Sequence, residues 1–343
     1  MKTRAAVIGV GAFGRNHVRV YRELERQDAN VTLVGIHDAD AARARDVAGE
    51  FGVRSFATLE ELKGEVDAAS VAVPTVQHLN VARALMEAGI DVLVEKPVAA
   101  TLAEAEELIR LAQRTTRVVQ VGHLERFNPA VRATAPLVTQ PMFFEVHRLS
   151  VFTPRALDVD VVLDLMIHDL DIVLSFVKSP VKEIRAVGLP ILSSRVDIAN
   201  VRMEFDSGCV ANFTASRVST EKVRKLRFFQ PHQYLSVDYT RQDVIAFTVQ
   251  SATAQAAMAG QSSPEAHPSG AGIKVEKPEI VHEEPLHAEL RAFLRAVRER
   301  SRPVVTLEDG RRALAVALDV LTAIRDHGRR INLESLGKPN RAT

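Results

Sequence analysis

The stretch Arg4-Ala-Ala-Val-Ile-Gly9-Val-Gly11-Ala-Phe-Gly14 decides the fold of this chain. It is a short apolar strand that runs into a Gly-x-Gly-x-x-Gly turn, and a helix is predicted to follow from Arg15 to about Leu24. The first glycine of such a turn allows a tight bend, the second lets backbone approach a pyrophosphate, and the third lets helix and strand pack closely. The free N–H groups at the helix start favour an anion. The turn is therefore predicted to bind a dinucleotide through Gly9, Gly11, Ala12, Phe13 and Gly14.

A second apolar run, Val31–His37, ends in Asp38, close to where such folds place the acid that binds the adenosine ribose. A carboxylate there repels the 2′-phosphate of NADP(H), and the next residue is Ala39 rather than an arginine. The sequence therefore predicts NAD(H) as the cofactor. The alternative is an acid that only solvates a strand end, but strand, turn, helix and acid in this order favour the dinucleotide site.

The composition bounds the class of protein. The 343 residues suggest two domains, and 46% of them are hydrophobic, enough to fill a core. Lys and Arg number 44 against 43 for Asp and Glu, which argues against a nucleic-acid or membrane-surface binder. No apolar run approaches membrane-spanning length, and the first strand begins too early for a signal peptide. The one cysteine, Cys209, excludes an internal disulfide and is expected in the core. We expect a cytoplasmic protein.

The first part of the chain alternates short apolar strands with amphipathic helices. After the acid, strands are expected at residues 68–73, 91–95 and 117–122, and helices at 41–51, about 78–88 and about 102–113. This alternation is typical of a doubly wound parallel sheet. The predicted fold class is α/β, with a Rossmann domain over residues 1–123.

The pattern changes after residue 123. Apolar and polar residues now alternate in closely spaced runs, at 143–149, 200–205, 209–215, 225–230 and 234–239. This indicates an antiparallel sheet with one covered face. A long helix is expected over about 159–176, a surface loop over 254–285, and closing helices at about 286–300 and 307–327. Residues 124–343 are therefore predicted to form an α+β domain on a mainly antiparallel open sheet.

Ligands of an open α/β sheet bind at the carboxyl ends of its strands. Besides the glycine turn, the segments expected at that edge are Val73-Pro74-Thr75 with His78, Glu95-Lys96-Pro97, and His123. Lys96 directly follows a buried strand, so its amine is expected in the crevice, where partial burial would let it take a proton from a hydroxyl. The alternative is a surface lysine after a strand.

A second candidate group is Asp164-Leu-Met-Ile-His168-Asp-Leu-Asp171. At helical spacing Asp164, His168 and Asp171 form a polar stripe on an otherwise apolar helix, so they must be paired or functional. His168 could bind the reacting hydroxyl. The alternatives are a solvated face or a metal site, for which this spacing alone is weak evidence; we expect no metal.

Several basic residues surround these elements and hint at an anionic substrate such as a diphosphate. Each alone is more often a solvated strand residue. They are Arg126, Arg148, Arg155, Arg217, Lys222, Arg224 and Arg227.

The chain resembles the Gfo/Idh/MocA family of NAD(P)-dependent sugar oxidoreductases over nearly its whole length. The matching motifs are Gly9-x-Gly11-x-x-Gly14, Glu95-Lys96-Pro97, Gly122-x-x-x-Arg126-Phe-Asn-Pro129, Asp164-x-x-x-His168-x-x-Asp171 and Glu284-Pro-Leu-His-Ala-Glu-Leu-Arg-Ala-Phe293. The resemblance implies Lys96 and His168 as catalytic residues, with Asp164 contacting substrate or His168. It also implies that the domain of residues 124–343 binds substrate and forms a homodimer or homotetramer through the C-terminal sheet.

Two departures bear on the substrate. Met166 stands where the family often has glycine, and Leu124 where many members carry a polar residue. The phrases around Arg126 and His168 are most similar to the subgroup that oxidises the 3-hydroxyl of UDP-N-acetylglucosamine for amino-sugar and lipid A biosynthesis. That reading makes Lys96, Arg126, Arg148, Arg155, Asp164, His168 and Arg217 the substrate-binding residues. The alternatives are a free-sugar or inositol dehydrogenase and a non-catalytic NAD(H)-binding regulator. The intact Lys96, Asp164 and His168 argue against the regulator.

Overall fold

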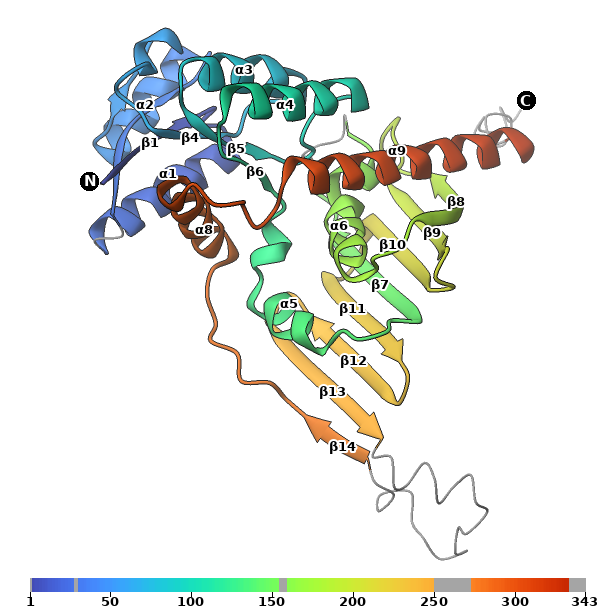
Figure 1. Ribbon diagram of the computed structural model, residues 1–343. Coiled ribbons are helices and arrows are strands. Elements are labelled where there is room, and N and C mark those ends of the chain that lie inside the picture. Colours follow the sequence, from blue (N-terminus) through green and yellow to red (C-terminus); the bar gives the residue numbers. More distant parts are fainter. Residues whose placement is uncertain (1, 28–29, 154–158, 250–272, 333–343) are drawn as a thin grey trace, which may run out of the picture. The chain divides into compact units, whose positions relative to one another are not determined.

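Figure 1 shows the computed structural model of the chain, which describes residues 2–27, 30–153, 159–249 and 273–332. Its internal contacts divide the chain into two compact units. The first unit comprises residues 1–127 and 283–316, and the second comprises residues 128–282 and 317–343. Each unit is built on one sheet, and the α/β fold class with a second, mainly antiparallel sheet is confirmed.

The first unit contains a six-stranded parallel sheet in the order β3-β2-β1-β4-β5-β6. All residues of the inner strands β4 and β5 are buried, as expected for a parallel sheet covered on both faces. The strand order reverses at β1, which puts the turn after β1 at the switch point where such sheets bind ligands. The strands are β1 (Thr3–Ile8), β2 (Val31–His37), β3 (Arg54–Ser55), β4 (Ala68–Val71), β5 (Asp91–Glu95) and β6 (Val119–Gly122).

Local sequence explains where the helices of this unit begin and end. The carboxylate of Asp40 accepts the N–H groups of Ala42 and Arg43 and so caps the second helix, which ends at Gly52 with a φ of 62°. A capping box between Thr101 and Glu104 begins the fourth helix. The helices are α1 (Ala12–Arg26), α2 (Ala41–Phe51), α3 (His78–Glu87), α4 (Leu102–Thr115) and α8 (Pro285–Glu299).

Helix α8 comes from the far end of the chain but completes the first unit. It packs against α1 (Figure 1), and its Leu290 and Phe293 are buried in the same core as Val18 and Leu24 of α1. The division expected at residue 123 assigned this helix to the second domain. The amphipathic pattern of α8 predicted a buried face but not the partner of that face.

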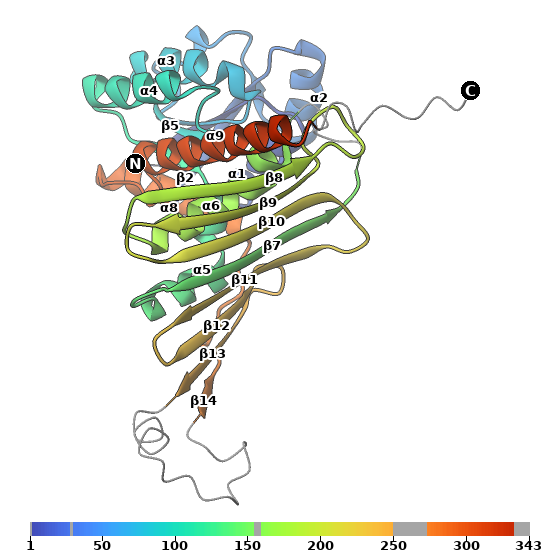
Figure 2. The ribbon, with the colours of Figure 1, turned by 90° about the vertical axis from the view of Figure 1, so that its right-hand side faces the viewer.

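The second unit contains an eight-stranded sheet, whose order β14-β13-β12-β11-β7-β10-β9-β8 is visible in Figure 2. Neighbouring strands are antiparallel except β7 and β10, which are parallel. The strands are β7 (Phe143–Val151), β8 (Val181–Leu189), β9 (Ile198–Phe205), β10 (Val210–Ser219), β11 (Val223–Gln230), β12 (Gln233–Asp238), β13 (Asp243–Val249) and β14 (Ile273–Glu276).

One face of this sheet is covered and the other is not. Phe144 and Phe228 on the covered face stack with Phe176 of helix α6 (Ile167–Phe176), and the short α5 (Pro129–Thr134) packs on β12 and β13. Strand alternation then places Phe143, Phe229, Tyr234 and Phe247 on the open face. The one-sided sheet predicted from the alternating runs is confirmed.

Several elements differ from the sequence expectation, which did not include β3, β8, β13 or α5. The helix expected over 159–176 is a π-helical segment, Val162–Met166, followed by α6. The surface loop expected over 254–285 contains strand β14, which pairs with β13; its residues up to 272 lie outside the described part of the chain. The last helix, α9 (Leu307–Arg330), is slightly longer than expected.

Candidate active site

The glycine turn between β1 and α1 is shaped as the spacing predicts. Gly9 has a φ of 83°, and a Cβ on it would lie 2.7 Å from the carbonyl oxygen of Ala72. A Cβ on Gly14 would lie 1.8 Å from the oxygen of Gly9, so only glycine allows helix and strand this close. A Cβ on Gly11 would meet nothing within 4 Å, which leaves that side of the turn open to a ligand. Gly11 is also the N-cap of α1 and makes no side-chain cap, so the first N–H groups of the helix remain available.

Asp38 lies beside this turn. Its Oδ2 atom accepts the N–H of Val10 at 2.8 Å, and its Oδ1 atom accepts the N–H of Asp40 at 2.9 Å. The turn and the acid line one cavity of about 680 Å³, together with Val73 and Pro74. An open glycine face, a helix start and a carboxylate around one cavity fit a dinucleotide, with Gly11 toward the pyrophosphate and Asp38 toward a ribose.

Arg43 was missed by the sequence analysis. It stands in the first turn of α2 and lines the same cavity, with its guanidinium 3.4 Å from both carboxylate oxygens of Asp38. The available signal was its position one helical turn after Asp40, the N-cap of α2.

His78 connects the ends of β4 and β5. Its Nε2 atom lies 3.0 Å from the carbonyl oxygen of Val73, and its Nδ1 atom lies 2.9 Å from that of Pro97. Burial lowers the pKa of His78, while the two carbonyl contacts oppose that change. Its ring is 1% exposed, so the contacts it makes are with these two segments. Thr75 begins the short 3₁₀ turn before α3.

Lys96 is half-buried directly after β5, as predicted. Its backbone N–H donates to the Oε2 atom of Glu95 at 3.3 Å, and the Lys96–Pro97 peptide bond is cis. His123 follows β6 and is buried. Arg126, in the next turn, lies 3.9 Å from a carboxylate oxygen of Asp309. These positions bring the predicted residues of the first unit to the carboxyl edge of its sheet.

Asp164 and His168 belong to the second unit, and both are half-buried. Asp164 lies in the π-helical segment, and His168 lies in the first turn of α6. π-Helical segments are rare and often occur at functional sites. Asp171, the third member of the predicted stripe, is buried, and so is its neighbour Asp169, which was not predicted to belong to it.

Two of the predicted substrate-binding arginines are engaged within the second unit. Arg148 makes a buried two-pronged ion pair with Asp169, at 2.7 and 2.9 Å, and its guanidinium lies over the ring of Tyr239. Arg217 donates to the carbonyl oxygen of Val159 and lies 3.7 Å from Asp197. These contacts give both side chains protein partners that the sequence did not predict. Arg155 lies outside the described residues.

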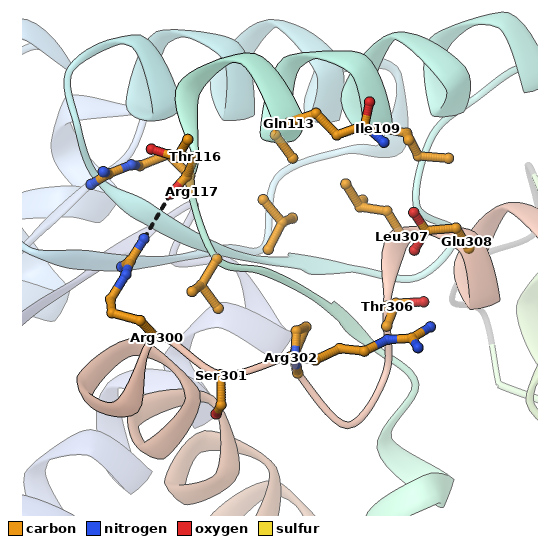
Figure 3. A pocket seen from close by; sticks show the side chains of 14 residues that line it. Ile109, Gln113, Thr116, Arg117, Arg300, Ser301, Arg302, Thr306, Leu307 and Glu308 are labelled. Carbon is orange, nitrogen blue, oxygen red and sulfur yellow. Dashed lines mark hydrogen bonds between the residues drawn. The ribbon is translucent and has the colours of Figure 1, made fainter.

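A different cavity, of about 550 Å³, lies at the opposite edge of the first sheet (Figure 3). It is lined by the end of α4, the start of β6 and the segment before α9. The guanidinium of Arg300 is already bonded to Asp91 and to the carbonyl of Thr116. None of the predicted site residues lines this cavity, and the amino ends of strands are not where α/β sheets bind cofactors.

Other chemistry finds little support among the described residues. No group of three or more His, Cys, Asp or Glu side chains there could hold a metal ion. Cys209 is buried, as predicted, and burial raises the pKa of its thiol to about 11, which keeps it protonated at neutral pH. None of the helices described is long and apolar enough to cross a membrane.

The fold and the site of the first unit define an oxidoreductase with a Rossmann sheet that binds NAD. Two family models match the chain: the oxidoreductase family with an NAD-binding Rossmann fold matches residues 3–123, and the GFO/IDH/MocA C-terminal domain matches residues 138–233. The chain belongs to the Gfo/Idh/MocA family of oxidoreductases, as the sequence motifs indicated, and NAD is its cofactor.

Individual members of the family show which enzymes the chain is similar to. The chain is 35% identical over 322 residues to the UDP-N-acetylglucosamine 3-dehydrogenase of Acidithiobacillus ferrooxidans, with 94% of this chain and 97% of that protein covered. A solved structure of that organism's enzyme matches with a TM-score of 0.84 at 34% identity, covering 94% of this chain and 98% of the other. The scyllo-inositol 2-dehydrogenase of Bacillus subtilis is 28% identical over 236 residues, 64% of this chain and 68% of that protein.

Proposed function

We propose that this protein oxidises the 3-hydroxyl of UDP-N-acetylglucosamine to a ketone and reduces NAD⁺. The observation that carries the proposal is the 35% identity to a UDP-N-acetylglucosamine 3-dehydrogenase across 94% of this chain. The Glu95-Lys96-Pro97 and Asp164…His168 motifs, which the sequence analysis assigned to sugar oxidation, support it. In this reading the 3-keto product is consumed by an aminotransferase in amino-sugar and lipid A biosynthesis.

The residues of this chain would divide the work as follows. When bound, NAD⁺ supplies the acceptor for the hydride that leaves the sugar carbon. The glycine turn, Asp38 and the Val73-Pro74 segment hold that cofactor, and the free N–H groups of α1 bind its pyrophosphate. Lys96 takes the hydroxyl proton at Nζ, so that the alcohol carbon can release its hydride. Asp164 and His168 bind the sugar hydroxyls.

The diphosphate of the substrate needs cationic partners. Arg148 is held by Asp169, and Arg227 pairs with Glu145 at 3.2 Å on the open face of the second sheet. Arg224 lies opposite Arg148 in the pairing of β11 with β7 and, by strand alternation, on the face that α6 covers. We assign the phosphate contacts to Arg126, which the sequence analysis named as a substrate residue, and to Arg224, because of its place on the covered face.

An inositol dehydrogenase is the second candidate, because the Bacillus subtilis enzyme matches 64% of this chain. An assay separates the two. The protein is incubated with NAD⁺ and either UDP-N-acetylglucosamine, free N-acetylglucosamine, myo-inositol or scyllo-inositol, with an aminotransferase present to consume the ketone. We expect NADH only from the nucleotide sugar, and inhibition by UDP alone. Robust turnover of an inositol, with UDP inert, would establish the alternative.

We propose further that the open face of the second sheet joins copies of this chain as a dimer or tetramer. Support comes from a ladder of stacked rings across four strands, Phe143, Phe229, Tyr234 and Phe247, with neighbouring centroids 4.9–5.7 Å apart. Phe229 and Phe247 are 39% and 36% exposed. Burying such rings at an interface releases water from large apolar surfaces.

The ladder can be tested by Phe229→Lys, which puts a charge in the middle of the ring stack. Sedimentation equilibrium should show a smaller species than the wild-type protein at the same concentration. Thr220→Lys, in the exposed turn before β11, is the matched charge change and should leave the assembly intact. An unchanged assembly in Phe229→Lys would place the interface elsewhere.

A further inference from the structure

A buried polar compartment lies in the first unit, and the proposed reaction does not use it. Three side chains carry it: His17 of α1, Glu95 at the end of β5 and Glu289 of α8. His17 and Glu289 are completely buried, and Glu95 is 7% exposed. Ionisable groups in such surroundings must be paired or serve a purpose, because burial without a partner costs stability.

His17 links the cofactor turn to the segment that holds Lys96. Its Nε2 atom lies 3.1 Å from the Oε1 atom of Glu95. Its ring also meets the edge of Phe13, a residue of the glycine turn, with centroids 5.3 Å apart. The imidazole therefore contacts both the turn after β1 and the end of β5.

The Glu95 carboxylate is fixed on its other sides as well. Its Oε2 atom accepts the backbone N–H of Lys96 at 3.3 Å. Gly122 at the end of β6 packs so closely that a Cβ there would lie 2.6 Å from the Oε1 atom. A displacement of this carboxylate would therefore move the backbone from which the Lys96 amine extends.

Glu289 stands beside this group without a hydrogen bond of its own. Neither of its carboxyl oxygens has a partner among the described residues, and Gln120 donates only to its backbone oxygen, at 3.3 Å. Burial, with the charge of Glu95 added, raises the pKa of the Glu289 carboxyl well above its usual range. This shift favours the neutral form of the carboxyl, which a glutamine would replace at lower cost, so its presence calls for a role.

No cation is hydrogen-bonded to the Glu289 carboxyl among the described residues. The elements packed against α8 are α1 and the turn 124–127, Gln120 of β6 is bonded to Glu289, and the charge of Glu95 in β5 acts on it. The ionisable groups that these elements and α8 itself carry nearby are His17 and Tyr21, Glu95, Glu125 and Arg126, and His287. Arg19 of α1 is bonded to Glu284, and Arg126 lies near Asp309.

We propose that His17 and Glu289 are positioning residues that act on Lys96 through the Glu95 carboxylate. His17 fixes the place of that carboxylate, and the buried Glu289 carboxyl, while it is uncharged, adds no negative charge beside it. The inference rests on the proposed role of Lys96 as the base. When Glu289 ionises as pH rises, a negative charge enters beside Glu95 and disturbs the position of the lysine.

The His17 part is tested by His17→Phe and His17→Gln. Phenylalanine keeps the bulk and removes the contact to Glu95, so kcat should fall by about 10- to 100-fold, the cost of a small misplacement of a reacting group. NAD⁺ affinity, measured by calorimetry, should stay near the wild-type value. Glutamine, whose amide nitrogen can replace Nε2, should recover most of the loss. Tyr21→Phe, one turn away and equally buried, removes the contact to Ser70 and should lower stability without changing kcat.

The Glu289 part is tested by Glu289→Gln, with Glu299→Gln at the exposed end of α8 as the matched control. At neutral pH the kcat of Glu289→Gln should equal that of the wild type. The pH at which kcat/KM falls on the alkaline side should be higher in the variant. Its melting temperature should exceed that of the wild type, and the difference should grow as pH rises above the unfolded pKa of about 4.3. The sign follows because the unfolded acid ionises there while the folded acid does not.

The outcomes separate this inference from the proposed function. If Lys96→Met keeps its turnover, the proposed base is wrong and the inference falls with it. If Lys96→Met is inactive but His17→Phe keeps wild-type kcat, or the pH profiles of Glu289→Gln and wild type coincide, only the positioning role is overturned. If His17→Phe does not fold, the other two variants still test the proposal. A His17→Gln protein that loses its activity would contradict it, and so would a Glu289→Gln protein whose pH profile does not shift.

Discussion

Two buried carboxyl groups, one in each unit, have opposite surroundings. Asp197 in the second unit accepts the N–H groups of Ile191, Leu192 and Ser193 at 2.6–2.8 Å and the hydroxyl of Ser193 at 2.7 Å. Burial alone would raise the pKa of Asp197, but these hydrogen bonds outweigh it and lower the pKa to about 2. Glu289 in the first unit has no such donors, and its pKa moves upward.

The difference teaches how to separate structural from functional charge in this protein. Asp197 and the Arg148–Asp169 pair are saturated with protein partners, so they hold loops and strands together. Glu289 lies in a compartment whose other carboxylate, that of Glu95, holds the backbone of Lys96. A saturated buried charge contributes to the fold, whereas an unsaturated one beside a candidate catalytic residue affects its chemistry.

The largest effect is expected at Lys96, because this residue directly follows Glu95, which lies in the same compartment as the unpaired Glu289. Lys96→Met removes the amine that takes the hydroxyl proton, so turnover should fall by about 100- to 10,000-fold. NAD⁺ should still bind, since the glycine turn is unchanged. NADH formation and calorimetric titration measure the two quantities, and exposed Lys63→Met is the matched control. Near-normal turnover would remove Lys96 from the mechanism.

Breaking the saturated pair of the second unit should affect stability first. Arg148→Met leaves Asp169 buried and uncompensated, which costs about 3–5 kcal/mol of the free energy of unfolding. Urea unfolding measures the loss. The double variant Arg148→Met with Asp169→Leu removes both charges and should recover much of that stability. If Arg148→Met unfolds like the wild type but loses affinity for UDP, the arginine is a substrate residue as the sequence suggested.

Much of the first unit could be predicted because its signals are local. The turn at Gly9–Gly14 and the acid at residue 38 depend on spacing along a single βαβ segment, and the strand and helix periods around them are regular. The carboxyl edge of a parallel sheet then gathers Val73, Lys96 and His123 without further information. Here local sequence and fold agree, so spacing alone placed the candidate site.

The rest of the fold and of the candidate site depends on contacts between residues that are distant in sequence. Arg148 could be assigned to substrate because nothing in β7 reveals that Asp169 of α6 packs beside it. Gln120 and Glu289 are 169 residues apart, and no pattern in α8 says that the helix returns to the first sheet. One signal was available: a buried acid such as Asp169 in an apolar helix needs a cation, and Arg148 was a candidate.

A smaller effect, with a pH dependence, is expected at Asp197. A folded pKa of about 2 against the ordinary 3.8 stabilises the fold by about 2 kcal/mol above pH 4, and this contribution is lost as pH falls toward 2. Asp197→Asn should therefore be less stable by about that amount at neutral pH and approach the wild type near pH 2. Urea unfolding at several pH values measures it. A loss that stays constant across this range would mean that shape, rather than charge, holds the loop.

The smallest effect is expected at Asp38, the acid that lines the cofactor cavity. It has fewer hydrogen-bond donors than Asp197 but more than Glu289. Asp38 accepts from Val10 and Asp40 and also lines the cavity with Arg43. Asp38→Ala removes the ribose acceptor and the repulsion of a 2′-phosphate, and it leaves the guanidinium of Arg43 without this acid beside it. The preference for NAD⁺ over NADP⁺ should narrow by about tenfold, near the value of one charge-assisted hydrogen bond.

The ratio of the affinities for NAD⁺ and NADP⁺ is the informative measurement, because a loosened turn weakens the binding of both cofactors alike. Adding Arg43→Ala should return the ratio toward NAD⁺ if the arginine meets the phosphate. A wild-type protein that prefers NADP⁺ would show that Asp38 serves the turn alone.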